Sequence, residues 1–174
     1  MNIIDLLFNI ASPRTKYITS TTGSIKKISF QSLRDAVLNT GASFVTSFMI
    51  KPNDTISVCM TESVDKIIII LSLLAYGITV DMVDNVSVDT HEGKILITDA
   101  NASALIIMNN ISGNEVCQLY DYDPNSVLTA IITSRSKITY TSLDTMIKCS
   151  ANIHCNVPAI DAFISIYQNV SYDI

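Results

Sequence analysis

Basic charge is scarce in this sequence. Its 174 residues include 11 lysines and arginines against 16 aspartates and glutamates, which gives a formal net charge of -5. The longest basic cluster is Lys26-Lys27. Proteins that bind nucleic acid neutralise the phosphate backbone with clustered positive charge. The composition therefore argues against nucleic acid as a partner.

Long hydrophobic runs are also missing. The longest apolar stretch, residues 67–76, has roughly half the length needed to cross a membrane, and a serine interrupts it. The first seven residues carry Asp5 where a secretory signal peptide has positive charge, and no small-residue cleavage site follows. We therefore expect a cytoplasmic protein with no membrane partner.

The sequence lacks the short motifs of common hydrolases, metalloproteases and nucleotide-binding enzymes, such as Gly-x-Ser-x-Gly, His-Glu-x-x-His and the Walker loop. His91 lies in a polar segment and His154 lies beside a cysteine. Isolated imidazoles of this kind are solvated or packed far more often than catalytic. Acidic pairs such as Asp81 with Asp84 fit strand ends and turns. We predict no catalytic residue.

The cysteines stand at irregular spacings, at Cys59, Cys117, Cys149 and Cys155. This distribution is typical of reduced thiols that pack as small hydrophobic side chains in a cytosolic protein. Cys149, His154 and Cys155 could be drawn as zinc ligands, but a structural zinc site needs a fourth ligand. We therefore predict no metal site.

Apolar residues make up 48% of the sequence and charged residues 16%. A chain of this length and composition is able to bury a substantial core, and a disordered tail is not expected. No internal repeat, low-complexity tract or linker is visible. We therefore predict one domain that spans residues 1–174.

The spacing of apolar residues and the positions of turn residues predict the elements of the first half. They are a helix within 2–10, a hairpin of strands 16–20 and 25–30, a helix over 31–49, a strand at 55–60, a helix over 64–76, and strands at 78–83 and 95–98. Thr61 or Ser63 is expected to cap the helix over 64–76, and Gly77 to end it.

The second half continues the alternation of helices and strands. We expect a helix over 99–109, strands at 116–120, 127–133 and 137–141, a helix over 142–152 capped by Ser142, and a final strand at 162–172, where the apolar spacing also suits a helix. Such alternation predicts an α/β fold with a largely parallel or mixed sheet between helices, preceded by an N-terminal β-hairpin.

Several stretches carry a family pattern. They are residues 25–33 (Ile-Lys-Lys-Ile-Ser-Phe-Gln-Ser-Leu), 49–60 (Met-Ile-Lys-Pro-Asn-Asp-Thr-Ile-Ser-Val-Cys-Met), the Ala75-Tyr76-Gly77 turn, 95–99 (Ile-Leu-Ile-Thr-Asp) and 123–134. Their order resembles the N-terminal subdomain of adenylate-forming enzymes, the superfamily of acyl-CoA synthetases, luciferases and peptide-synthetase adenylation domains. The resemblance covers nearly the entire chain and implies the fold of that subdomain.

The sequence departs from the family at the phosphate-binding loop. In the family a glycine-rich loop follows the segment that corresponds to 123–134, whereas this sequence has no glycine after Gly113. A loop that wraps triphosphate needs glycines, because its backbone N–H groups must turn inward to approach the anion. The resemblance leaves Thr133, Ser134 and Lys137 as a degenerate remnant of this loop. We expect a shortened hairpin there and no bound cofactor.

The C-terminal residues 161–174 resemble the strand that leads into the Ser-Phe-Asp element of amino-acid-activating domains. The resemblance implies that Asp173 corresponds to the aspartate that holds the substrate's amino group. The family's second subdomain and mobile C-terminal domain have no counterpart in the sequence. Adenylation depends on preplaced donors and metal-held oxygens around the reacting phosphate. We therefore predict that the chain is a pseudoenzyme.

These features favour a catalytically inactive, adenylation-like protein that acts as a structural or regulatory partner in an acyl-activating or nonribosomal peptide pathway. The expected partner is a synthetase, a carrier protein or a second copy of the chain in a homodimer. One alternative is half of a split adenylate-forming enzyme that a partner chain completes. Another is a small-molecule binding module with a pocket at the carboxyl edge of the sheet.

Overall fold

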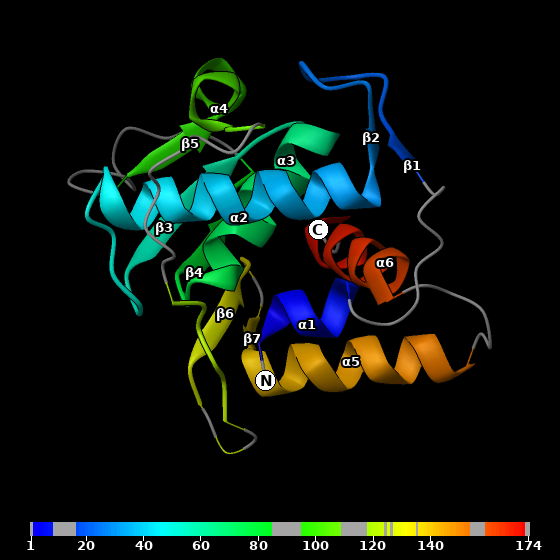
Figure 1. Cartoon of the computed structure of the whole chain (residues 1–174). Coiled ribbons are helices and arrows are strands. Elements are labelled where there is room, and N and C mark those ends of the chain that lie inside the picture. Colours follow the sequence, from blue (N-terminus) through cyan, green and yellow to red (C-terminus); the bar gives the residue numbers. More distant parts are fainter. Residues whose placement is uncertain are drawn as a thin grey trace.

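The computed structural model describes residues 2–8, 17–84, 95–108, 118–123, 125, 127–134, 136–153 and 159–172 (Figure 1). Within these residues the central sheet has five strands in the order β5-β3-β4-β6-β7. The strands are β3 (Thr55–Cys59), β4 (Thr79–Met82), β5 (Leu96–Thr98), β6 (Thr129–Ile132) and β7 (Lys137–Thr139). The first four run parallel, and β7 pairs antiparallel with β6. The predicted α/β class is confirmed.

Helices surround this sheet (Figure 1). They are α1 (Ile3–Phe8), α2 (Phe30–Thr46), α3 (Val64–Ala75), α4 (Asp99–Leu105), α5 (Tyr140–Ile153) and α6 (Ala159–Tyr172). α2 packs along α3, whereas α6 packs against α1 and α5. A separate antiparallel hairpin joins β1 (Tyr17–Thr19) to β2 (Lys27–Ser29), and this confirms the predicted N-terminal hairpin.

The core is built around α3, of which every residue from Val64 to Ala75 is buried. The continuous apolar run of the sequence explains this, because a helix that is hydrophobic on all sides needs neighbours on all sides. Each fully buried isoleucine or leucine of α3 stabilises the fold by about 1.5–3 kcal/mol relative to an exposed one. The buried Ser72 hydroxyl is not left without a hydrogen bond, because it donates to the Ile68 carbonyl at 2.6 Å.

Both ends of α3 follow the sequence signals. At the start, the Ser63 hydroxyl accepts a hydrogen bond from the Lys66 amide at 3.1 Å, so that Ser63 rather than Thr61 is the cap. At the end, Gly77 has a φ of +77°, a conformation that favours glycine. A Cβ atom there would also lie 2.8 Å from the Tyr120 ring.

Two predictions for the C-terminal part are corrected. Residues 159–172 form the helix α6, so the predicted final strand at 162–172 is wrong. Ile160, Phe163 and Tyr167 repeat at the helical spacing and are buried. A helix places all three side chains on one face, whereas a strand would not. Ser142 is not the cap of α5, because the helix begins at Tyr140 and the Ser142 amide donates to the Thr139 hydroxyl at 3.1 Å.

A third correction concerns the predicted strand at 116–120. Residues 118–120 are described and form no strand, while 116 and 117 lie outside the described residues. The Tyr120 amide instead donates to the Ala75 carbonyl at 2.9 Å, and its ring covers Gly77. This segment therefore covers the end of α3 and adds no strand to the sheet. The polar segment with His91 lies outside the described residues.

Candidate functional site

The turn between β6 and β7 contains the predicted loop remnant. The Thr133 amide donates to the Ser136 carbonyl at 2.8 Å, and the Ser136 amide donates to the Thr133 hydroxyl at 3.1 Å. Both amides are therefore used within the turn and do not point at a ligand. Lys137 is the exposed first residue of β7, where it lies opposite Ile132. Ser134 is exposed beside them.

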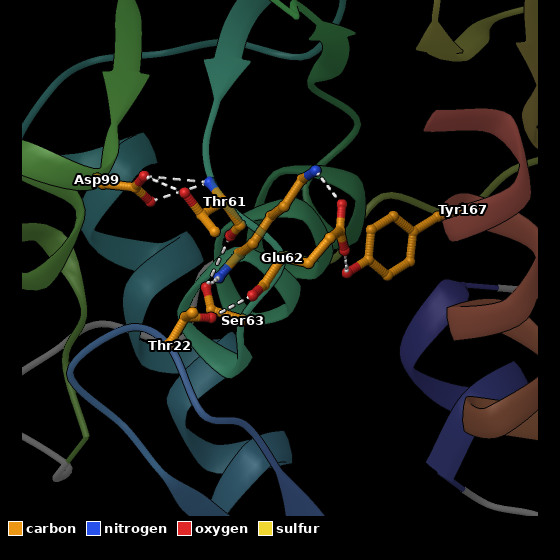
Figure 2. Close-up of polar contacts among 7 residues, drawn as sticks. Thr22, Thr61, Glu62, Ser63, Asp99 and Tyr167 are labelled. Carbon is orange, nitrogen blue, oxygen red and sulfur yellow. Dashed lines mark hydrogen bonds and ion pairs between the residues drawn. The ribbon is translucent and has the colours of Figure 1, made fainter. Parts of the chain in front are cut away.

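The carboxyl ends of β3 and β5 are tied together by Asp99, the first residue of α4. Its carboxylate accepts the Thr61 amide at 3.1 Å and the Thr61 hydroxyl at 2.7 Å (Figure 2). Parallel strands end at the same edge of a sheet, so this contact fixes the two chain segments that leave the sheet there. Ligands of open α/β sheets commonly bind at this carboxyl edge.

Glu62 links the start of α3 to α6. One of its carboxylate oxygens lies 2.5 Å from the Lys66 ammonium, and the other accepts a 2.6 Å hydrogen bond from the Tyr167 hydroxyl (Figure 2). The Lys66 side chain is only 6% exposed and that of Glu62 is 26% exposed. The Lys66 ammonium also lies 5.6 Å from the centre of the Tyr167 ring. A buried ammonium needs such compensation, because desolvating an unpaired charge is costly.

Asp65 attaches the β1–β2 hairpin to α3. Its carboxylate accepts the Ser24 amide at 3.0 Å, the Ser24 hydroxyl at 2.6 Å and the Ile25 amide at 3.0 Å. Burial alone raises the pKa of Asp65, but the hydrogen bonds from Ser24 and Ile25 outweigh it, so the pKa lies below the ordinary value. Asp65 is therefore a charged clamp between the hairpin loop and the helix.

Two cavities lie near this clamp. The larger, which we call the hairpin cavity, has a volume of about 590 Å³ and lies between the β1–β2 hairpin, the start of α3, and α6. Its polar lining consists of Glu62 and the hydroxyl residues Thr19, Ser20, Thr21, Thr22, Thr61 and Ser63. Its apolar lining consists of Ile18, Val64, Ile67, Ile164 and Tyr167. The smaller cavity, of about 310 Å³, lies between the hairpin loop and α4.

A cluster of tyrosines fills the other end of α3. The Tyr140 hydroxyl donates to the Leu74 carbonyl at 2.9 Å, and the Tyr122 hydroxyl donates to the Asp144 carboxylate at 2.8 Å. Burial raises the pKa of Tyr140, and burial together with the Asp144 carboxylate raises that of Tyr122. Both phenols therefore stay protonated and serve as hydrogen-bond donors in the core.

The remaining sequence candidates are not brought together. Asp173, Cys117, His154 and Cys155 lie outside the described residues. Cys59 is half-buried and Cys149 is exposed, both as free thiols. No group of three His, Cys, Asp or Glu side chains suited to a metal occurs among the described residues. Likewise, none of the helices in the described ranges is long and apolar enough to span a membrane.

Sequence reasoning missed the contact of Glu62 with Lys66 and Tyr167. The sequence does indicate a pairing of Glu62 with Lys66, because residues four positions apart near a helix start are neighbours. The partner Tyr167 lies 105 positions away, and no local pattern indicates so distant a contact.

No protein-family model matches the sequence, and no curated protein matches it. Solved structures match the fold. The structure of McyG A-PCP in complex with phenylalanyl-adenylate has a TM-score of 0.64 at 12% identity, and the match covers 90% of this chain and 36% of that one. Apo MatB from Rhodopseudomonas palustris has a TM-score of 0.63 at 14% identity, with coverages of 90% and 38%. The N-terminal subdomain of NpsA from Klebsiella oxytoca has a TM-score of 0.55 at 10% identity, with coverages of 84% and 44%.

These similarities identify the architecture as that of the N-terminal subdomain of adenylate-forming proteins, and they confirm the resemblance drawn from the sequence. The chain spans 36% to 44% of the length of the three structures named above. At such low identity the match defines the fold and leaves the activity to be argued from the residues.

Proposed function

We propose that this chain does not adenylate a carboxylic acid by itself and acts as an adenylation-like interaction protein. Its proposed place is an acyl-activating or nonribosomal peptide pathway, where it has a structural or regulatory role. The proposed partner is a synthetase, a carrier protein or a second copy of the chain. The proposal is supported by the similarity of its fold to adenylation domains and by the chemistry of the β6–β7 turn.

The turn from Thr133 to Ser136 is the observation that carries the proposal. Adenylation develops negative charge on a phosphate, and its rate depends on donors already aimed at that charge. In this turn the amides of Thr133 and Ser136 donate to oxygen atoms of the same two residues. Freeing them for a phosphate would break the turn, and no glycine follows that would let the backbone re-form around an anion.

A split enzyme is the second candidate. It is favoured by the coverage of the solved structures, because the chain corresponds to 36% of the McyG A-PCP chain. In that case a partner polypeptide supplies the remaining subdomains. The partner would also have to bring its own phosphate-binding groups, since the described residues of the turn between β6 and β7 do not offer them. This requirement makes the split enzyme the weaker of the two proposals.

The two candidates are separated by ATP–pyrophosphate exchange with the products of neighbouring genes. The purified chain, each gene product and their mixtures are assayed with a panel of amino and carboxylic acids. Exchange that appears only on mixing with an otherwise inactive polypeptide supports the split enzyme. A stable complex with an already active synthetase or its carrier protein supports the interaction protein. A chain that stays monomeric by light scattering and binds none of these proteins contradicts the interaction proposal.

A further inference from the structure

The described residues that line the hairpin cavity include no basic side chain. Its one carboxylate belongs to Glu62, which is matched by the Lys66 ammonium at 2.5 Å and by the Tyr167 hydroxyl at 2.6 Å. The remaining polar groups of the lining are hydroxyls and backbone atoms. A phosphate that entered would meet no basic side chain of this lining, and a metal ion would have to displace Lys66 from the Glu62 carboxylate, so neither ion gains a free counter-charge to offset the loss of its hydration. The cavity therefore suits a neutral molecule.

Hydrogen-bonding capacity remains free in this lining. The hydroxyls of Thr19 and Thr21 are exposed and make no hydrogen bond within the described part of the chain. A hydroxyl both donates and accepts, and a carboxylate offers about four acceptor positions. Glu62 uses its carboxylate for two side-chain partners, Lys66 and Tyr167. These groups complement a ligand that carries several hydroxyl groups of its own.

The floor of the cavity is apolar. Ile18 and Ile164 are half-buried beside it, and Val64 is fully buried beneath it. A sugar or another polyol has hydroxyl groups along its edges and a C–H surface between them, so it matches a polar rim around an apolar floor. The volume of about 590 Å³ falls within the range of roughly 300–1,000 Å³ that small-molecule pockets occupy.

Hydrogen bonds within the protein hold the rim in place. The Ser20 hydroxyl donates to the Thr22 carbonyl at 2.9 Å, and the Thr22 hydroxyl donates to the Glu62 carbonyl. Asp65 holds the following residue pair, Ser24 and Ile25, against α3. A preorganised rim binds a ligand without the entropic cost of ordering a loop.

The geometry points to the hairpin cavity as a binding site for a small neutral ligand with neighbouring hydroxyl groups, the chemistry of a sugar or another polyol. Thr19, Thr21 and Glu62 exchange hydrogen bonds with the ligand, and Ile18 and Ile164 contact its C–H surface. This site goes beyond the proposed function, since it lies at the hairpin and does not involve the β6–β7 turn on which that proposal rests.

The test is a nuclear magnetic resonance titration of the labelled full chain with glucose and with myo-inositol. Each is added to about 10 mM, ten times the concentration that half-saturates a millimolar binder. Glucose 6-phosphate and glucosamine serve as charged counterparts. The expected result is a saturable shift of resonances from residues 18–22 and 62–64 with a neutral polyol, and a weaker or absent effect with the charged compounds.

Variants locate the site. Thr19→Val and Thr21→Val each remove an exposed hydroxyl that makes no hydrogen bond to another described residue, so the fold should be preserved. Each is expected to weaken binding about two- to tenfold, the factor for one neutral hydrogen bond. Thr145→Val on the exposed face of α5 is the matched control and leaves binding unchanged. The proposal is overturned if no neutral polyol shifts the hairpin resonances, if the charged compounds bind equally well, or if the two rim variants bind like the control.

Discussion

The hydroxyl of Tyr167 donates a 2.6 Å hydrogen bond to the carboxylate of Glu62, and thereby joins α6 to the residue that precedes the cap of α3, across 105 positions of sequence. The same carboxylate neutralises the buried Lys66 ammonium. The docking of α6 and the compensation of a core charge therefore depend on one side chain. This coupling makes the contact a sensitive point of the fold.

Tyr167→Phe is expected to destabilise the chain. The substitution removes a hydrogen bond to a charged acceptor, a contact that contributes about 1.5–3 kcal/mol. The free energy of unfolding, measured by urea denaturation, should fall by that amount. Tyr17→Phe is the matched control, because Tyr17 is an exposed residue of the hairpin, and its change should stay within about 0.5 kcal/mol. Equal effects of the two substitutions would contradict the role of the contact.

The ion pair of Glu62 with Lys66 predicts a non-additive pair of substitutions. Glu62→Gln alone leaves a buried ammonium without its counter-charge, which costs up to about 3–5 kcal/mol at a fully buried site. The cost here should be smaller, since the Glu62 side chain is 26% exposed. Adding Lys66→Met removes the orphaned charge, and the double variant should recover most of the loss in thermal unfolding experiments. If the double variant is less stable than Glu62→Gln alone, the pair is not coupled in this way.

The Asp65 clamp predicts an acid-dependent loss of stability. Its folded pKa is held below the ordinary value of 3.8, so its contribution is complete above that value and is lost as the pH falls through the folded pKa. Asp65→Asn should therefore lower the stability at neutral pH and flatten the acid limb of the stability curve. Urea denaturation at a series of pH values measures both effects. Asp84→Asn, at an exposed position, should leave the acid limb unchanged.

Gly41→Ala tests the close packing of α2 on α3. A Cβ atom at Gly41 would lie 2.3 Å from the Tyr76 ring and 2.8 Å from the Ser72 carbonyl oxygen. The overlap should destabilise the fold by roughly 1–3 kcal/mol, more than the gain of about 1 kcal/mol in helix propensity. Ser43→Ala, on the half-buried side of the same helix, is the control and should change little. If thermal denaturation showed Gly41→Ala to be more stable than the unmodified protein, α2 and α3 could move apart at no cost and their close packing would not be required.

Much of the fold could be predicted from local patterns. The apolar run of α3 and the serine and glycine at its ends define that helix closely, because its capping and its burial depend on residues within or directly beside the helix. At 162–172 the apolar spacing suits a helix as well as the predicted strand, so local pattern alone does not decide between them. The burial of Ile160, Phe163 and Tyr167, together with the packing of α6 against α1 and α5, decides in favour of the helix, and no local pattern identifies those packing partners.

The site could be predicted only in part. The lack of glycine after Gly113 correctly indicated a short connection between β6 and β7, which are paired as an antiparallel hairpin. The inactivity expected from that connection stays a prediction. The hairpin cavity was not predicted, because it needs β1, the start of α3, and α6 to meet, and such a meeting depends on tertiary structure.

The central claim is that the β6–β7 turn offers no cradle for triphosphate, and titration of the labelled chain with magnesium-ATP tests it most directly. The amides of Thr133 and Ser136 are already hydrogen-bonded within the turn, so their resonances should not move. A saturable shift of these amides and of Ser134 that Lys137→Ala abolishes would contradict the account.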